Sequence, residues 1–134
     1  MQGIRVKLKE HISKREEVKE LSEKIEHLKD SLTSIKSSSQ FGVRAASGSY
    51  DKIGEFIATI ERLETIYYKK MCDLTKETIE IEQIINALPS RERRLIRSRY
   101  LEGHTFEQIC YEMNYSWRHV HRLHGEALKK LEAL

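Results

Sequence analysis

The sequence predicts an all-α protein: a long antiparallel helical hairpin, coiled-coil-like, followed by a small C-terminal helix-turn-helix domain. Three observations lead to this prediction. The 134 residues are rich in Glu, Lys, Leu, Ile and Arg and include one proline, so few positions break a helix. Apolar residues recur at heptad spacing through the first two thirds of the chain. The last third consists of short apolar stretches separated by capping and turn residues.

The composition and the distribution of charge suit this architecture. Apolar residues make up 39% and charged residues 34% of the chain, a balance typical of long helices with one buried stripe. Residues 1–88 hold 15 basic and 15 acidic side chains, whereas residues 89–134 hold 9 basic and 6 acidic ones. The whole net charge of +3 therefore lies in the C-terminal third, where a surface for nucleic acid would be expected.

The first helix is predicted over residues 4 to about 35. Its apolar residues are spaced alternately by three and four, which is a heptad seam: Val18, Leu21, Ile25, Leu28, Leu32 and Ile35. Upstream the seam weakens, because His11 and Lys14 occupy seam positions while Leu8 and Ile12 lie one step away. We expect the first two turns either to fray or to pack differently.

A flexible loop is predicted at residues 36–49, where Ser, Gly and Ala interrupt the helical period. A second long helix then runs from about Tyr50 to Leu88. Its seam consists of Ile53, Phe56, Ile60, Leu63, Tyr67, Leu74, Ile81 and Leu88. Neither helix can bury its stripe alone, so residues 1–88 are predicted to form an antiparallel hairpin for oligomerisation or partner binding.

The second domain is predicted at residues 89–134, because the residue before Pro89 is biased away from helical geometry. Ser90 is expected to cap a helix that runs to Glu102, and Gly103 to provide a left-handed C-cap. Thr105 and Gln108 are spaced as a capping box for the next helix, from Phe106 to about Met113.

A tight turn and a third helix complete the predicted helix-turn-helix. Asn114 and Tyr115 form the turn, since Asn tolerates the left-handed conformation, and Ser116 caps the last helix. The helix that begins after Ser116 is the second helix of the helix-turn-helix motif. In this motif the second helix points its first residues at base edges in the major groove. The residues expected to read bases are Trp117, Arg118, His119, His121 and Arg122. Those expected to contact phosphates are Arg91, Arg93, Arg94, Thr105 and Ser116. The alternative reading of this face is a solvated, basic helix end.

Other chemistry has little support in the sequence. Cys110, His119, His121 and His124 suggest zinc, but only His121 and His124 have helical ligand spacing and Cys110 lies on a buried face. No glycine-rich phosphate loop or Ser/His/Asp order is present, so we expect no enzyme activity, no metal and no cofactor. Two unrelated cysteines and the absence of a long apolar stretch indicate a cytoplasmic protein without a membrane partner.

The C-terminal segment resembles region 4 of sigma-70 factors. The resemblance rests on the opening LPSRERR, on RYLEG at 99–103, on TFEQI, on the turn that ends at Ser116, and on the final ALKKL. The segment YSWRHVHRLHGEAL is similar to the phage and prophage transcriptional regulators that include the ArpU and RinA proteins. What the resemblance implies is recognition of promoter or operator DNA by a protein of phage origin.

The predicted function is therefore that of a sequence-specific DNA-binding transcriptional regulator of phage or prophage origin. It would bind double-stranded DNA at the host nucleoid, and its hairpin would form a homo-oligomer or contact RNA polymerase. One alternative is a small terminase subunit for DNA packaging, which would assemble as a ring. Another is a sigma-like module that binds RNA polymerase without touching DNA.

The split in charge and heptad pattern generates a first prediction. Residues 1–88 should oligomerise without binding DNA, and residues 88–134 should bind DNA weakly on their own. Analytical ultracentrifugation and DNA titration of the two fragments and the whole chain measure this. A dimer of the whole chain suits a regulator and a ring of eight or more suits packaging, whereas a monomer at micromolar concentration contradicts the oligomer prediction.

Overall fold

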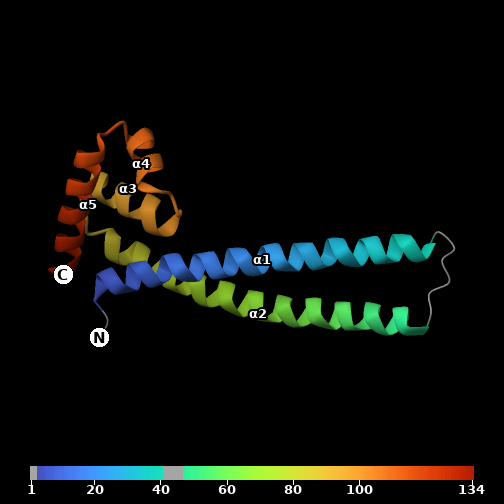
Figure 1. The fold of residues 1–134 in the computed structure, drawn as a ribbon. Coiled ribbons are helices and arrows are strands. Elements are labelled where there is room, and N and C mark those ends of the chain that lie inside the picture. Colours follow the sequence, from blue (N-terminus) through green and yellow to red (C-terminus); the bar gives the residue numbers. More distant parts are fainter. Residues whose placement is uncertain (1–2, 41–46) are drawn as a thin grey trace. The chain divides into compact units, whose positions relative to one another are not determined.

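The structure, a computed structural model, describes residues 3–40 and 47–134. Every regular element in these residues is helical (Figure 1): α1 (Ile4–Gln40), α2 (Ser47–Ile85), α3 (Ser90–Ile96), the π-helix η1 (Arg97–Leu101), α4 (Phe106–Met113) and α5 (Trp117–Glu132). The predicted all-α fold, with two long antiparallel helices followed by a short-helix domain, is confirmed.

The C-terminal end of α1 and the N-terminal end of α2 both extend further than the sequence predicts. Residues 36–40 belong to α1 and residues 47–49 belong to α2, so these parts of the predicted loop at 36–49 are helical. Extending an existing helix gains one hydrogen bond for each residue fixed, and serine costs only a modest amount of helix propensity. The remainder of the predicted loop, including Arg44, lies outside the described residues.

The chain divides into two compact units. One unit combines Met1–Glu16 with Asp73–Leu134, and the other is Glu17–Cys72. This division differs from the predicted domain boundary at residues 88 and 89. The first residues of α1 and the last residues of α2 belong to the same unit as the short helices. In Glu17–Cys72 the two helices are antiparallel, with Lys70 3.3 Å from Glu17 and Lys29 3.8 Å from Glu64. The predicted seam is buried there at Val18, Ile25 and Ile60.

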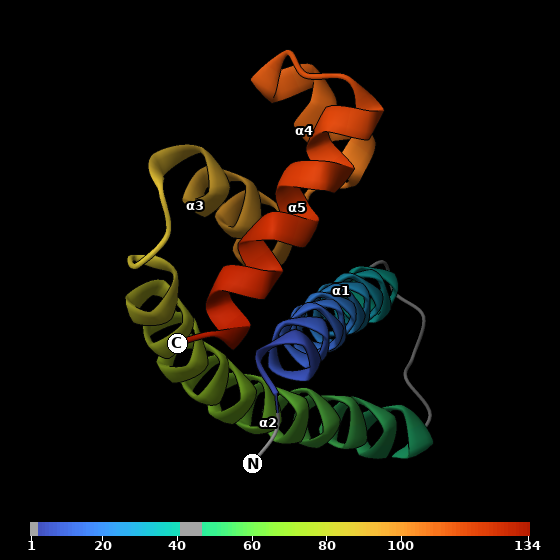
Figure 2. The same ribbon diagram turned by 90° about the vertical axis from the view of Figure 1, so that its left-hand side faces the viewer.

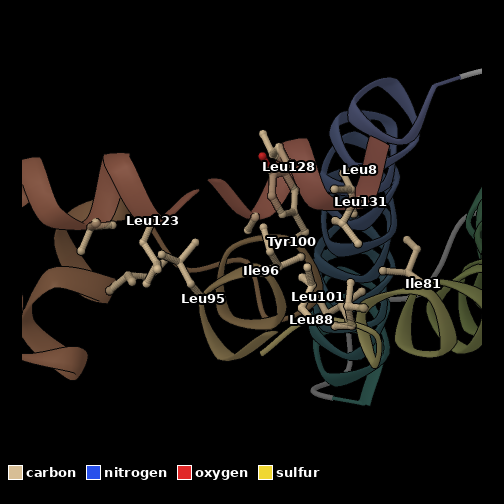
Figure 3. Close-up of a cluster of buried hydrophobic side chains, with 14 residues drawn as sticks. Leu8, Ile81, Leu88, Leu95, Ile96, Tyr100, Leu101, Leu123, Leu128 and Leu131 are labelled. Atoms are coloured by element: carbon tan, nitrogen blue, oxygen red, sulfur yellow. The ribbon is translucent and has the colours of Figure 1, made fainter. Parts of the chain in front are cut away.

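A single hydrophobic cluster fills the other unit (Figure 3). It joins side chains from α1 and α2 to those of the short helices: Leu8, Ile81, Ile85, Leu88, Leu95, Ile96, Tyr100, Leu101, Ile109, Val120, Leu123, Ala127, Leu128 and Leu131. Arg5 also forms an ion pair with Glu132, at the end of α5. A fragment that begins at residue 88 therefore lacks three residues of its own core, namely Leu8, Ile81 and Ile85.

The start of α1 packs in its own way, as the weakened seam predicted. Leu8 and His11 are both fully buried, so a polar ring takes a seam position. Nδ1 of His11 lies 2.9 Å from one Glu77 carboxylate oxygen, and Lys14 donates to the other oxygen at 2.7 Å. Burial alone would raise the pKa of Glu77, but the hydrogen bonds from Lys14 and His11 outweigh it and hold this pKa below its ordinary value.

The connection between α2 and α3 is a tight turn. α2 ends at Ile85, three residues earlier than predicted, and the Leu88 amide donates to the Ile85 carbonyl at 3.0 Å. The prediction that Ser90 caps α3 is wrong, because Pro89 occupies the N-cap position and Ser90 is the first helical residue. The fixed φ of proline, here −55°, suits the start of a helix, and no side-chain cap is formed.

The predicted helix from Ser90 to Glu102 changes its winding at Arg97. The Glu102 amide donates to the Arg97 carbonyl at 3.0 Å, five residues back, which defines the π-helix η1. Buried Ser98 anchors this turn, since its hydroxyl lies 2.9 Å from Nδ1 of His104 and its carbonyl accepts from the His104 amide at 3.0 Å. Gly103 follows with a φ of +78°, which confirms the predicted left-handed position.

The shared cluster generates a prediction about stability. Leu8→Ala should lower the free energy of unfolding by about 2–5 kcal/mol, because it leaves a cavity against side chains of α2 and the short helices. Val6→Ala, on the exposed side of the same helix, should change it by less than about 0.5 kcal/mol. Urea denaturation of both variants measures this. Equal effects of the two substitutions would contradict the shared core.

Candidate nucleic-acid interface

The candidate interface is formed by α4, the following turn and α5, and local sequence signals build all three. The Thr105 side chain accepts from the Gln108 amide at 3.2 Å, while the Gln108 side chain accepts from the Thr105 amide at 2.8 Å. The predicted capping box is thus confirmed. Asn114 ends α4 in the left-handed conformation, with a φ of 56°. Ser116 then accepts from the His119 amide at 3.1 Å, as predicted for the start of α5.

The inner face of α5 fixes how this helix sits on the domain. Its buried residues are Val120, Leu123, Ala127, Leu128 and Leu131. The helix as a whole contacts α3 and α4 (Figure 2). Near the end of the helix, Lys130 donates to Oε1 of buried Glu92 in α3 at 2.7 Å. These contacts leave the opposite side of α5 as the side available to a ligand.

One flank of α5 is an aromatic cluster with Phe106 of α4 at its centre. The ring centroid of His121 lies 4.5 Å from that of Phe106 and 4.3 Å from that of Trp117. The Arg99 guanidinium covers the Phe106 ring at 4.5 Å. Nε2 of His121 is buried and has no hydrogen-bond partner among the described residues. His121 is therefore engaged with its neighbours, while Trp117 remains 55% exposed.

The other flank holds Tyr115, His119 and Arg91. The rings of Tyr115 and His119 are stacked with centroids 4.2 Å apart, and Arg91 donates to the Tyr115 hydroxyl at 3.2 Å. This hydrogen bond comes first among the causes that raise the pKa of Arg91 above its ordinary value. Arg91 is thereby held beside the first turn of α5, close to the residues predicted to read bases.

Arg118 and Arg122 project from the outer face of α5, between the two flanks. At about 100° per residue they lie within about 40° of each other and opposite the buried residues. Both are exposed, and neither forms a hydrogen bond or ion pair within residues 3–40 and 47–134. Lys129 continues the same stripe eleven residues after Arg118. The sequence analysis missed Lys129, although its spacing of seven residues from Arg122 could have revealed it.

The residues predicted to contact phosphates lie on α3 and at the N-caps of α4 and α5. Arg91 and Arg94 are exposed on α3, whereas Arg93 is partly buried and contributes to lowering the pKa of Glu82. Thr105 and Ser116 are exposed at the N-caps of α4 and α5. Their hydroxyl oxygens already accept backbone hydrogen bonds, which leaves each hydroxyl proton available to an acceptor such as a phosphate.

His124 connects α5 to η1 from the inner side. Its Nε2 lies 2.7 Å from the Tyr100 hydroxyl, within hydrogen-bond distance, and a neutral imidazole with its proton on Nδ1 accepts from that hydroxyl. Burial, with smaller contributions from His121 and Arg99, lowers the pKa of His124 from 6.5 to about 4. No group of three or more His, Cys, Asp or Glu residues in the described parts of the chain could hold a metal ion.

The comparison with protein families agrees with this geometry. Residues 84–133 match the family described as "Sigma-70, region 4". The C-terminal part of the chain is therefore a helix-turn-helix domain of sigma-70 region 4 type. The match begins in the last turn of α2, so the region 4 domain includes the junction that leads into α3. The resemblance inferred from LPSRERR and TFEQI is thereby confirmed at the level of the domain, while the narrower likeness to ArpU and RinA stays a prediction.

A curated relative extends the similarity beyond the region 4 domain. The chain is 30% identical over 86 residues to the RNA polymerase sigma factor TcsR of Paraclostridium sordellii. The aligned part is 63% of this chain and 50% of that protein, so the chain spans about half the length of the curated relative. No solved structure matches the chain. Within the described residues, no helix combines the length and apolarity needed to cross a membrane.

The depressed pKa of His124 generates a prediction about pH. Between pH 6.5 and about 4 the unfolded chain takes up a proton at His124 that the folded protein does not, so stability falls as the pH is lowered. His124→Gln keeps an acceptor for Tyr100 but does not titrate. The difference in free energy of unfolding between the two proteins should therefore shift in favour of the variant over this range, and stay constant above it.

Thermal or urea unfolding from pH 7.5 to 4 measures this difference. The carboxylates that lose their ion pairs in acid, such as Glu77 and Glu82, are common to both proteins and cancel in the comparison. Parallel pH profiles for the two proteins would show that His124 is protonated normally in the folded state.

Proposed function

We propose that this protein is a sequence-specific regulator of transcription that reads double-stranded DNA with α5. The observation that carries the proposal is the free, outward pair Arg118 and Arg122, which lies on the second helix of the helix-turn-helix in a region 4 domain. The basic excess of residues 89–134 supports an anionic partner for this surface.

The proposed mode of binding places the first turns of α5 in the major groove. Arginine can donate two hydrogen bonds to O6 and N7 of one guanine, which specifies that base. Trp117 and His119 would border these contacts, and His121 would support them through its ring contacts. Arg91, Arg93 and Arg94, with the hydroxyls of Thr105 and Ser116, would hold phosphates and fix the register of the helix.

The long helices would serve assembly. In Glu17–Cys72 the side chains of Ile57, Ile66 and Tyr68 remain 38%, 41% and 61% exposed, which favours a further protein surface against this part of the hairpin. A second copy of the chain is the partner we propose, since a dimer would present two region 4 domains to two half-sites. Phage or prophage origin and action at the host nucleoid complete the proposal, and the neighbouring genes would test the origin.

A second candidate function follows from the printed name of the relative, which is an RNA polymerase sigma factor. In this case the region 4 domain would act while bound to RNA polymerase. Co-purification of the whole chain with core RNA polymerase, in the presence and absence of DNA, distinguishes the two. Binding to polymerase with no DNA selection by the protein alone would favour the second candidate.

The roles proposed for the arginines generate a prediction about binding. Arg118→Ala should weaken binding to the preferred DNA by about 1–3 kcal/mol and relax the preference at one base pair. Arg93→Ala should weaken binding to all sequences alike and lower the salt slope by about one, because a phosphate contact carries no sequence information. Selection from a random DNA pool, followed by titration at several salt concentrations, measures both effects.

Arg62→Ala provides the matched control. Arg62 is an exposed arginine in Glu17–Cys72, so this variant loses the same charge outside the region 4 domain. It should retain both the affinity and the selected sequence. If Arg118→Ala also retains both, α5 does not enter the major groove in the proposed way.

A further inference from the structure

Gly125 occupies a place in α5 that the fold does not explain. It is the ninth of sixteen residues in this helix, where glycine is less favourable than every other residue except proline. A Cβ atom built at this position would meet no atom within 4 Å apart from the adjoining residues and backbone of its own helix. Its backbone conformation is helical, unlike that of Gly103, so a positive φ does not require glycine either. Neither packing nor conformation within the described chain accounts for it.

The position of Gly125 on the helix connects it to the basic stripe. At about 100° per residue, Gly125 lies within about 20° of Arg118 and within about 60° of Arg122 and Lys129. It therefore interrupts the stripe between Arg122 and Lys129 with a patch of bare backbone. The buried residues of α5, such as Leu123 and Ala127, face the other way.

The depth of the major groove indicates which part of the DNA would lie against the bare helix backbone at Gly125. Gly125 lies about 10 Å along the axis from Arg118, at about 1.5 Å per residue. The major groove is about 8.5 Å deep, so a helix whose first turn contacts base edges reaches the groove wall about there. The wall is the sugar–phosphate chain, and Arg122 and Lys129 would stand on either side of the contact with charges that complement it.

We propose that Gly125 is a docking point for the DNA sugar–phosphate backbone, which approaches the bare backbone of α5 there between Arg122 and Lys129. This inference rests on the proposed function and adds a contact to it. Glycine permits an approach that a methyl group would prevent, and Lys129 reaches its phosphate only if the helix comes close. The energetic cost of glycine in the free protein is then offset in the complex.

Gly125→Ala tests the proposal, because it should act on folding and on binding in opposite directions. The variant should unfold at a temperature about 2–8 °C higher, as expected for replacing glycine by alanine in a helix. It should bind the preferred DNA about 5- to 30-fold more weakly and show a lower salt slope, since phosphate contacts are lengthened or lost. The sequence selected from a random pool should not change, because the contact is made to the backbone.

Gly54→Ala is the matched control. Gly54 also lies inside a helix, in α2, and a Cβ there also meets nothing within 4 Å. It belongs to Glu17–Cys72 and not to the region 4 domain. This variant should show a similar rise in unfolding temperature, with DNA affinity within about twofold of that of the unaltered protein.

The outcomes separate this inference from the proposed function. If the unaltered protein selects no DNA, both are overturned. If it selects DNA and Gly125→Ala binds equally well, only the role of Gly125 is overturned. A changed sequence preference in Gly125→Ala would also overturn it, since that result places the residue against base edges. A lower unfolding temperature would mean that the fold itself needs the glycine.

Discussion

The position of α5 depends on a hydrophobic core that the helix-turn-helix does not supply alone. The short helices form a very small domain, and domains of that size bury little apolar surface by themselves. Leu8 from α1 and Ile81 and Ile85 from α2 complete the cluster around them, and all three are fully buried. The region 4 domain thus shares its hydrophobic core with the first turns of α1 and the last turns of α2. A change in the first turns of α1 would reach the candidate interface through packing, although α1 contributes nothing to that interface.

The two flanks of α5 make its outer face well defined before any ligand arrives. On one side Trp117 and His121 pack with Phe106, and on the other side His119 stacks on Tyr115. Rings held by neighbours restrict the rotation of the helix about its axis. The helix face that carries Arg118 and Arg122 is therefore fixed relative to the domain, which lowers the ordering cost of a specific contact. Neighbouring residues of α5 therefore take different roles: the packed rings of His119 and His121 support the helix, while Arg118 and Arg122 face outward.

Polar groups inside the domain are placed so that most of them keep a partner. His11 meets Glu77 in the seam, His124 meets Tyr100 beneath α5, and Lys130 covers one oxygen of Glu92. Buried polar groups that find partners add specificity to a core whose apolar contacts alone are non-directional. The His11–Glu77 pair joins the two long helices, whereas the other two pairs join α5 to η1 and to α3, so each pair ties together elements of its own part of the fold.

The sequence by itself determined the elements whose signals are local. The capping box at Thr105, the left-handed Asn114 and the cap at Ser116 depend on groups within a few residues of one another. The outward position of Arg118 and Arg122 follows from helical period alone. The tertiary structure decided the rest, because burial depends on partners up to more than a hundred residues away. It buried Leu8 and His11 in a weak seam, turned His121 toward Phe106, and left open space around Gly125.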